Sequence, residues 1–328
     1  MKAIICKQYG PASDLVLEDL PEPELGPSQV RIKVKATALN FFDTLLVKGK
    51  YQYKPEPPFS PGGEFAGIVD EVGSEVSTVQ KGDAVIAYMI WGAAQETLVV
   101  EADKLTLIPD GVNYDHAAGL MITYGTAIHG LRGRGDVKPC ETVAVLGASG
   151  GAGLAAVEVA KAMGAHVIAC ASSQDKLKVA QEHGADELIN YSDEDLKGTL
   201  KKLTNGKGVD VVYDAVGGDL AEPALRAMAW RGRYLVVGFA SGDIQSFPAN
   251  LTLLKGCDVR GVFWGRAIDE EPEEHKKDML QLLDWLKSGS IRPRIHAVYS
   301  FEDFEKAFDE ISSRRAKGKV ILHPSSEV

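Results

Sequence analysis

The feature that most constrains the fold is a series of short aliphatic runs that alternate with helical segments between Thr142 and Trp264. Near-continuous apolar runs between helices are typical of strands buried on both faces, as in a parallel sheet with right-handed crossovers. Weaker runs bring the count to about six, the usual number for a doubly wound nucleotide-binding sheet. The strong runs are 142–146, 166–170, 209–213 and 233–237, and the weaker ones are 187–190 and 259–263.

The first hundred or so residues follow a different pattern, with strands and turns in place of helices. Residues 29–35 alternate apolar with polar or basic side chains, as half-buried strands do. Further strand-like runs stand at 65–69 and 84–88. With 328 residues, the chain has room for two domains of ordinary size. We therefore expect an α/β protein in which a compact, mostly β domain accompanies the parallel sheet.

Composition and charge exclude several classes of partner. The formal net charge of −10 opposes binding to nucleic acid, and no dense basic run is present to hold an anionic membrane. No apolar run reaches the roughly 18 residues of a membrane helix, and the N-terminus lacks a signal-peptide core. The cysteines are far apart and form no CxxC pair, which is best explained by buried free thiols in a reducing compartment. We expect a cytoplasmic protein.

A glycine-rich loop follows directly after the first buried strand, and a helix over 154–163 comes next. A dinucleotide pyrophosphate binds backbone N–H groups at such a helix N-terminus, where side chains must not block its approach. The strict GxGxxG fingerprint is broken at Ala148, but strand, loop, helix and second strand come in the expected order and length. The purely structural alternative is a glycine turn that only permits helix–sheet packing. The predicted cofactor-binding residues of the loop are Gly147, Ser149, Gly150, Gly151, Ala152 and Gly153.

The end of the second buried strand indicates which dinucleotide is bound. NAD sites usually carry Asp or Glu there for the ribose hydroxyls, whereas this strand ends in Ser172 and Ser173, with Lys176 one helical turn further. A 2′-phosphate would be repelled by a carboxylate and attracted by Lys176, and Tyr191 after the third strand could add a hydroxyl donor. Ser173 and Lys176 could instead be an N-cap and a solvated helix residue, and both interpretations can hold at once. We predict NADPH as the cofactor, bound by Ser172, Lys176 and Tyr191.

No metal site is predicted. A catalytic zinc needs three protein ligands from cysteine, histidine or carboxylate side chains. Cys6 is the only cysteine of the β domain, and closely spaced cysteines for a structural zinc are absent. The histidines lie beyond that domain, at His116, His129, His166, His183, His275, His296 and His323.

Taken together, these motifs resemble those of the zinc-free medium-chain dehydrogenase/reductase superfamily, and most closely the quinone oxidoreductase (zeta-crystallin) family. The resemblance runs from end to end of the chain. Zinc-dependent relatives carry a cysteine about where Asn40 stands and a histidine where Gly63 stands. The resemblance therefore agrees with the lack of zinc ligands in this sequence. Besides the glycine loop, it rests on the segments 40–44 (Asn-Phe-Phe-Asp-Thr), 61–67 (Pro-Gly-Gly-Glu-Phe-Ala-Gly), 123–127 (Thr-Tyr-Gly-Thr-Ala), 214–218 (Asp-Ala-Val-Gly-Gly) and 318–320 (Gly-Lys-Val).

The resemblance implies a GroES-like catalytic domain formed by residues 1–118 and 266–328, with a Rossmann NADPH-binding domain of residues 119–265 inserted between them. It also implies a cleft between the domains for nicotinamide and substrate, and commonly a homodimer joined through the last Rossmann strand. The family's Gly-Lys-Tyr phosphate grip falls on Ser172, Lys176 and Tyr191. The serine departs from the family pattern but is still small and able to donate a hydrogen bond.

The resemblance also supplies the predicted catalytic residues, Asn40, Asp43, Tyr51 and Thr123. Asn40 would hold the carboxamide or the substrate oxygen, and Tyr51 would donate a proton or shape the pocket. Asp43 has a structural alternative, which we favour, as a carboxylate that satisfies backbone N–H groups at a helix start. Thr123 would lie along the nicotinamide.

Further cofactor contacts are expected beyond the carboxyl ends of the later strands, where ligands of parallel sheets bind. Phe239 and Trp264 are two such expected contacts. Phe239 could instead pack in the core, and Trp264 could instead cover an interface. The predicted cofactor-binding set is completed by Thr123, Val216, Phe239, Ala240, Phe263, Trp264, Gly265 and Lys319.

Without a metal or an evident acid/base dyad, the chemistry must rely on positioning and on exclusion of water. Acceptors that suit such a site are already electron-poor. The sequence therefore predicts hydride transfer from NADPH to a small-molecule quinone or conjugated carbonyl, with Asn40 or Tyr51 as hydrogen-bond donors to the developing oxyanion. Two alternatives stay open: an NADPH-dependent alkenal or enone reductase, and an NADPH-binding accessory or sensor protein with negligible turnover.

Overall fold

The computed structural model describes residues 1–324 of the chain. The chain divides into two compact units, unit 1 (Met1–Ile122 and Pro293–Val328) and unit 2 (Thr123–Arg292). Each unit has its own core of buried aliphatic and aromatic side chains.

Unit 2 contains the parallel sheet that the aliphatic runs predict. Its six strands are ordered β10-β9-β8-β11-β12-β13, and all neighbouring strands are parallel. The order reverses between β8 and β11, which is the point where such sheets bind ligands at the carboxyl ends of their strands. The strands are β8 (Thr142–Leu146), β9 (His166–Ala171), β10 (Glu187–Asn190), β11 (Val209–Asp214), β12 (Met228–Val236) and β13 (Asp258–Gly261). The predicted Rossmann sheet is confirmed, although its last strand ends at Gly261, two residues earlier than expected.

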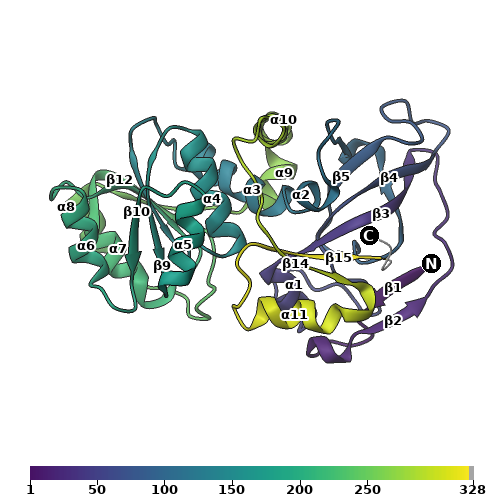
Figure 1. The fold of residues 1–328 in the computed structure, drawn as a ribbon, viewed down its shortest axis with the longest axis horizontal. Helices are drawn as coiled ribbons and strands as arrows, with labels where there is room; N and C mark the ends of the chain where they lie inside the picture. The colour runs from purple at the N-terminus through teal and green to yellow at the C-terminus, as the bar shows by residue number, and fades with distance from the viewer. Residues whose placement is uncertain (325–328) are drawn as a thin grey trace. The chain divides into compact units, whose positions relative to one another are not determined.

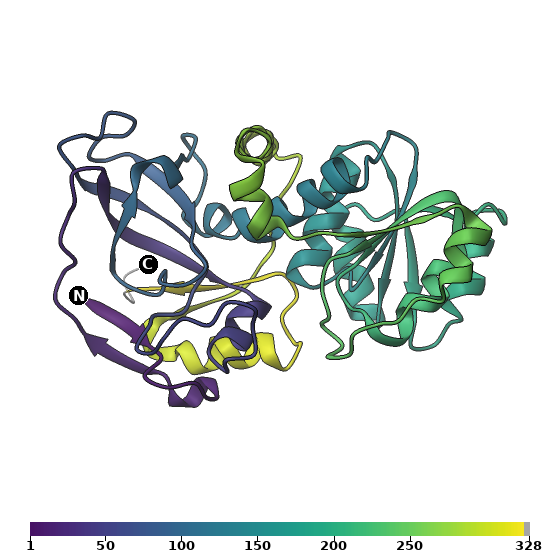
Figure 2. The same cartoon turned by 180° about the vertical axis from the view of Figure 1, so that it is seen from behind.

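Helices cover both faces of this sheet. α4 and α5 lie on one side, and α6, α7 and α8 lie on the other (Figures 1 and 2). The central strands are largely apolar on both faces because each face is covered, which explains the near-continuous aliphatic runs. The helices are α3 (Met121–Ile128), α4 (Gly151–Ala162), α5 (Gln174–Glu182), α6 (Leu196–Leu203), α7 (Ala221–Ala227), α8 (Ala249–Lys255), α9 (Trp264–Glu270) and α10 (Pro272–Ser288), with a π-helical segment η3 (His129–Arg134) and a 3-10 turn η4 (Gly218–Leu220).

The compact units and the predicted domains differ in residues 119–122, which we assigned to the Rossmann domain, and in residues 266–292, which we assigned to the catalytic domain. Residues 266–292 form most of α9 and all of α10, and they pack with unit 2. Trp264 at the start of α9 covers Gly125 and meets the ring of His275 edge-on. Asp278 of α10 forms an ion pair with Arg132. The periodicity of α10 predicts a helix but does not say which core it covers.

Unit 1 is built on a mostly antiparallel sheet that combines both ends of the chain. Its order is β14-β15-β3-β4-β5-β7, with β6 paired to β3, and a separate ribbon joins β1 to β2. β15 runs antiparallel to β3, with Val320 opposite Leu39, so the C-terminal segment completes the sheet begun by the N-terminal one. The strands are β1 (Lys2–Ile5), β2 (Val16–Asp19), β3 (Gln29–Leu39), β4 (Glu64–Val72), β5 (Ala84–Tyr88), β6 (Thr97–Glu101), β7 (Thr106–Leu107), β14 (Ile295–Ser300) and β15 (Lys319–His323). The expected GroES-like architecture is confirmed.

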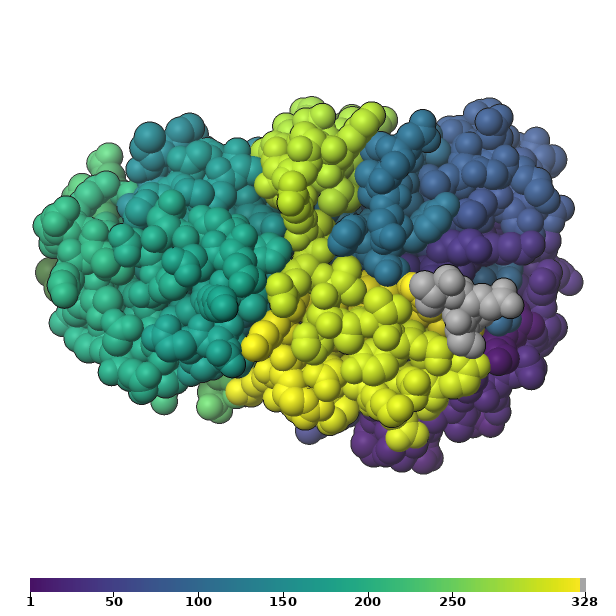
Figure 3. Space-filling model, viewed as in Figure 1, coloured from purple at the N-terminus to yellow at the C-terminus, as the bar shows by residue number. Residues whose placement is uncertain are grey.

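Short helices flank this sheet. α11 packs against α1 and the turn η1, and Figure 3 shows it in yellow-green beside the purple N-terminal segment. None of the helices in the described part of the chain combines the length and the apolar character that a bilayer span needs. The helices and turns are α1 (Phe41–Leu46), α2 (Tyr114–Ala118), α11 (Phe304–Ser312), η1 (Ala12–Asp14), η2 (Ala102–Lys104) and η5 (Phe301–Asp303).

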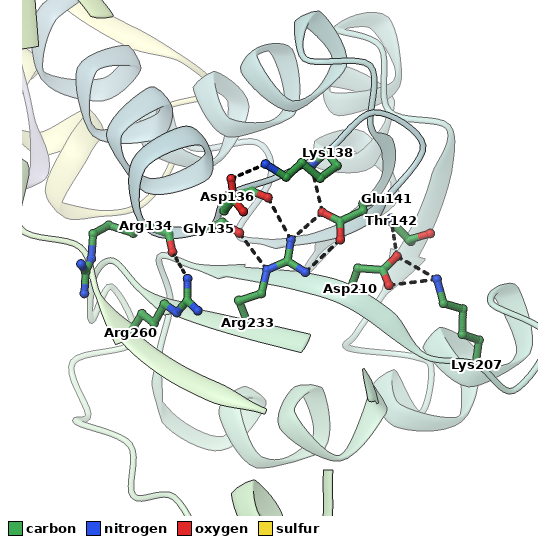
Figure 4. Close-up of polar contacts among 10 residues, drawn as sticks. All are labelled: Arg134, Gly135, Asp136, Lys138, Glu141, Thr142, Lys207, Asp210, Arg233 and Arg260. Atoms are coloured by element: carbon green, nitrogen blue, oxygen red, sulfur yellow. Dashed lines mark hydrogen bonds and ion pairs between the residues drawn. The ribbon is translucent and has the colours of Figure 1, made fainter. Parts of the chain in front are cut away.

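A polar network fastens the loop that enters β8 at the amino ends of the unit 2 strands (Figure 4). The Arg233 guanidinium donates to the Gly135 carbonyl oxygen at 2.7 Å and to Glu141 Oε1 at 2.9 Å, with a second bond to the other carboxylate oxygen. The loop needs this support because two of its residues, Asp136 and Cys140, adopt left-handed φ values of 46° and 69°.

Cys140 is exposed, which corrects the expectation that all four thiols are buried. The other three cysteines are buried, and all four thiols are free.

Candidate functional site

Four buried polar side chains meet in unit 1 where β3 ends and where β4 and β15 begin: Asn40, Asp43, Glu64 and Lys319. The register of the sheet brings them together, because Leu39 lies opposite Val320 and Ala38 lies opposite Glu64. Lys319 Nζ lies 2.7 Å from Glu64 Oε1, and both side chains are at most 3% exposed. This is an ion pair removed from water.

The amide of Asn40 is bound to both members of this pair. Its Oδ1 accepts from Lys319 Nζ at 2.6 Å, and its Nδ2 donates to Glu64 Oε1 at 2.9 Å. The orientation of the amide is therefore fixed, with the oxygen toward the ammonium and the nitrogen toward the carboxylate. We predicted that Asn40 holds the carboxamide or the substrate oxygen, and we placed Lys319 among the cofactor-binding residues. The structure gives each of them partners inside unit 1, and both roles stay predictions.

Asp43 has the structural environment that we favoured for it. The residue is fully buried, and its carboxylate accepts from the backbone N–H of Asn40 at 2.7 Å and of Gly62 at 3.2 Å. Burial raises the pKa of Asp43 to about 7, although the N–H of Asn40 and the charge of Lys319 act in the opposite direction. The carboxylate thus ties the start of α1 to the turn before β4.

Tyr51 lies in an aromatic group. Its ring centroid is 5.1 Å from that of Phe42 and 6.0 Å from that of Tyr53. Burial raises the pKa of the Tyr51 phenol to about 12, with smaller contributions from Tyr53 and Asp43. The phenol therefore keeps its proton at neutral pH and is able to donate it.

The space next to Gly63 is filled by neighbouring side chains. A side chain at this position would collide with the ring of Phe42 and approach the Met89 carbonyl oxygen at 3.0 Å. Among residues 1–324, no group of three or more histidine, cysteine, aspartate or glutamate side chains is placed to hold a metal ion. Metal independence stays a prediction.

In unit 2, the glycine loop joins β8 to α4 as expected. Gly147 adopts φ +76°, and Gly153 cannot carry a side chain because a Cβ would collide with the Gly147 carbonyl oxygen. Gly150 differs, because it precedes α4 with φ −75° and an added Cβ would meet nothing closer than 3.7 Å. Packing therefore explains Gly147 and Gly153 but not Gly150. A bare backbone at a helix N-terminus suits the approach of a phosphate group. Ser149, Gly151 and Ala152 lie in the same turn.

The predicted 2′-phosphate residues lie together at the carboxyl ends of β9 and β10. Lys176 Nζ lies 3.2 Å from Ser172 Oγ, and the two strands place Tyr191 just beyond the pairing of Asn190 with Ala171. Ser173 is also the N-cap of α5, since its hydroxyl accepts from the Lys176 N–H at 3.4 Å. Asp175, the acidic residue of the first turn, is exposed. The serine thus has the capping role that we left open, and Lys176 faces its neighbour Ser172.

The remaining predicted cofactor residues are more dispersed. Val216 and Ala240 lie in loops beyond β11 and β12, where Ala240 N donates to the Ala215 carbonyl oxygen at 3.2 Å. Phe239 and Phe263 are both 42% exposed, so core packing does not account for Phe239. Thr123 is buried in α3. Trp264 is buried within unit 2, and Gly265 follows it in α9.

Five buried carboxylates escaped the sequence interpretation as individual residues: Glu64, Glu158, Asp210, Asp214 and Asp278. Asp214 Oδ1 accepts from the N–H groups of Val216 and Gly217 at 2.8 and 2.9 Å, which shapes the loop after β11. A charged residue at the end of an aliphatic run is the signal that could have singled out Asp214. Glu64 stands similarly at the start of a strand.

Comparison with known proteins agrees with this architecture. Residues 26–110 match the alcohol dehydrogenase GroES-like domain family, and residues 151–287 match the family described as zinc-binding dehydrogenase. The chain is 40% identical over 322 residues to quinone oxidoreductase-like protein 2 of Rattus norvegicus, which covers 98% of this chain and 91% of the relative. It is 35% identical to quinone oxidoreductase of Pseudomonas aeruginosa, over 98% and 99% of the two chains.

Solved structures lead to the same group. The Escherichia coli quinone oxidoreductase, crystallised as a complex with NADPH, superimposes with a TM-score of 0.91 at 30% identity, over 99% of this chain and all of that one. Sequence relatives and fold coincide along nearly the whole chain, and the matched domain families cover residues 26–110 and 151–287. The chain therefore belongs to the quinone oxidoreductase (zeta-crystallin) family of medium-chain dehydrogenases/reductases, and it is an oxidoreductase.

Proposed function

We propose that this protein uses NADPH to reduce quinones or other electron-poor conjugated carbonyls without a metal ion. The observation that carries the cofactor assignment is the contact between Lys176 Nζ and Ser172 Oγ at the end of β9, where NAD sites usually have a carboxylate. An ammonium and a hydroxyl at that position attract a 2′-phosphate. The Escherichia coli relative that was crystallised with NADPH supports the same choice.

The residues of unit 2 fit such a cofactor. Gly150 leaves the N-terminus of α4 bare although the protein itself would accept a methyl group there, so the N–H groups of Gly151 and Ala152 are the expected pyrophosphate donors. Ser172, Lys176 and Tyr191 would hold the 2′-phosphate. Val216, Phe239 and Ala240 lie beyond the carboxyl ends of β11 and β12, where the nicotinamide half is expected. When bound, NADPH supplies the hydride.

Unit 1 would contribute the groups that bind and protonate the substrate. The Tyr51 phenol is protonated at neutral pH and is the proposed donor to the developing oxyanion. The Asn40 amide is fixed in orientation by Glu64 and Lys319, and it stays the proposed group that holds the carboxamide or the substrate oxygen, since an amide nitrogen has two N–H donors. Because this proposal offers the acceptor hydrogen-bond donors and no metal ion, the acceptor must be electron-poor before it binds, which favours quinones and conjugated carbonyls.

The partner that we propose for the intact protein is a second copy of the chain. β13 forms the end of its sheet, with its outer edge unpaired among the described residues, and apolar side chains stand exposed around it. We call Trp230, Leu253, Leu254 and Val259 the β13 edge surface, and they are 68%, 77%, 65% and 38% exposed. An unpaired strand edge beside exposed apolar side chains is a typical protein interface.

A substrate panel tests the proposed function. Purified protein is mixed with NADPH or NADH and a series of quinones, alkenals and enones, and cofactor oxidation is followed by absorbance. We expect turnover of quinones with NADPH and little with NADH. Turnover of alkenals and enones alone would establish the alkene reductase instead, and tight NADPH binding without turnover would establish the accessory protein.

A further inference from the structure

Glu158 is a buried carboxylate in the middle of α4 that no predicted function uses. It is 6% exposed, and its oxygens are surrounded by donors from three other segments of unit 2. It accepts from the Tyr124 hydroxyl, from His183 Nδ1 at 2.6 Å and from the Arg292 N–H at 3.1 Å. A buried carboxylate is costly unless donors satisfy it. The Glu158 side chain is thus held by three contacts from outside its own helix.

The bond to His183 joins the two helices whose N-termini face the phosphates of the proposed cofactor. Glu158 lies seven positions after Gly151 at the start of α4, and His183 lies seven positions after Lys176 of α5. At about 1.5 Å per residue, Glu158 is about 10 Å from the start of α4, and His183, nine positions after Gln174, is about 13 Å from the start of α5. The turn after α5 lies against α4 near here, because a Cβ on Gly184 would lie 3.2 Å from the Cγ of Lys161. The contact therefore joins the middle of α4 to the end of α5.

The covalent structure of NADPH fixes the distance between its pyrophosphate and its 2′-phosphate. A protein that binds both groups strongly must hold the glycine loop and the Ser172–Lys176 pair at the matching separation, since small displacements weaken charge-assisted hydrogen bonds. NADH lacks the second phosphate and does not impose this requirement. The spacing of α4 and α5 should therefore affect the binding of NADPH more than the binding of NADH.

We propose that Glu158 and His183 are positioning residues that set this spacing and thereby determine the preference for the phosphorylated cofactor. The inference rests on the proposed use of NADPH. Neither residue touches the cofactor in this proposal; both act through the helices that carry Gly150 and Lys176. Tyr124 fixes the beginning of α3, next to Thr123, to the same carboxylate.

The test compares dissociation constants for NADPH and NADH, measured by fluorescence titration, in His183→Ala and Glu158→Gln. His183→Ala removes the link and leaves Glu158 its other donors. We expect the dissociation constant for NADPH to rise about tenfold and the dissociation constant for NADH to change less than twofold. A tenfold change is smaller than the loss of a whole charge-assisted hydrogen bond would cause. His183→Asn keeps a donor near Nδ1 and should restore the preference. Glu158→Gln keeps the size of the side chain and should lower the preference in the same direction.

The matched control is Glu141→Gln, which breaks the pair with Arg233 at the opposite end of the same sheet (Figure 4). This variant should melt at a lower temperature and keep the wild-type ratio of the two dissociation constants. Equal ratios in His183→Ala and wild type would overturn the role of Glu158 and His183, as would a reduced ratio in Glu141→Gln. A wild-type protein without any preference for NADPH would instead overturn the cofactor assignment itself.

Discussion

Lys319 and Glu64 show how single residues organise unit 1, because their charges are neutralised by each other and not by water. Taking two ions out of water costs several kcal/mol, and apolar residues of similar size would often be as stable. What the pair adds is direction: the ammonium and the carboxylate bind opposite ends of the Asn40 amide and fix its orientation. The position that holds a cysteine in zinc-dependent relatives is thus part of a rigid polar cluster.

Removing one member of this pair should destabilise unit 1 more than removing both. Lys319→Met leaves the Glu64 carboxylate buried without its cation, which typically costs about 3–5 kcal/mol. The double variant Lys319→Met/Glu64→Gln should recover most of that loss, as measured by the free energy of unfolding in urea. A double variant as unstable as the single one would show that the lysine acts through packing and not through charge.

Asp43 should make the stability depend on pH. Its pKa is raised by burial to about 7 in the folded chain, compared with about 3.9 when unfolded. The folded state therefore holds the proton more tightly, and stability from this residue falls as the pH rises from about 4 to about 7. Relative to Asp43→Asn, the wild type should lose free energy of unfolding over that range. Parallel stability curves for the two proteins would contradict the assignment.

Lys176 should discriminate between the two cofactors. Lys176→Met removes the cation beside Ser172, and the loss of one charge-assisted contact predicts about 10–100-fold weaker binding of NADPH. NADH binding, measured in the same calorimetric titration, should stay within about twofold. The control is Lys178→Met on the exposed side of α5, which should change neither. Equal weakening of both cofactors would exclude a 2′-phosphate contact.

At the scale of elements, the loop between β8 and α4 contains glycines that packing requires and one glycine that packing does not require. Gly150 has room for a methyl group within the protein, whereas Gly153 has none. Gly150→Ala should lower the melting temperature only slightly, since the loss of an N-cap glycine costs under about 1 kcal/mol. The same substitution should weaken the binding of NADPH and of NADH alike, by about tenfold or more, because the methyl group would stand where a phosphate approaches.

Gly153→Ala is the matched substitution. Its Cβ would collide with the Gly147 carbonyl oxygen, so this variant should be clearly destabilised, by more than about 1 kcal/mol. If Gly150→Ala binds both dinucleotides as tightly as the wild type, the pyrophosphate does not lie at this turn.

Elements with local patterns could be predicted, and contacts between distant elements could not. The central strands β8, β9, β11 and β12 follow from aliphatic runs because a sheet covered on both faces disfavours polar side chains. The partners of Lys319 do not follow from any local pattern, since Glu64 lies 255 positions earlier and Asn40 lies 279 positions earlier. Glu158 could not be distinguished from a solvated residue of α4 for the same reason, because its donors come from segments outside that helix.

The compact unit that holds α9 and α10 could not be predicted, because a helix pattern shows which face is apolar but not which unit covers it. Asp43 was the opposite case: a carboxylate three positions into a helix is a local signal for binding backbone N–H groups, and the structure shows that contact.

At the scale of the whole molecule, the proposed homodimer depends on the β13 edge surface. Leu253→Glu/Leu254→Glu places two charges there and should convert a particle of about twice 35.2 kDa into a monomer, as measured by sedimentation velocity. Leu280→Glu replaces a leucine that is 58% exposed on α10 and lies outside this surface, so it should leave the assembly unchanged. A wild-type protein that sediments as a monomer at micromolar concentration would refute the proposed partner.

The pairing of β15 with β3 also has a consequence for the order in which the chain acquires its structure. On the ribosome, all of unit 2 is synthesised before β14, α11 and β15, so the inserted unit can close while unit 1 still lacks its last two strands. Until Lys319 appears, the Glu64 carboxylate has no ammonium to pair with, and the Asn40 amide can rotate. Unit 1 thus completes its sheet last, when β15 pairs with β3.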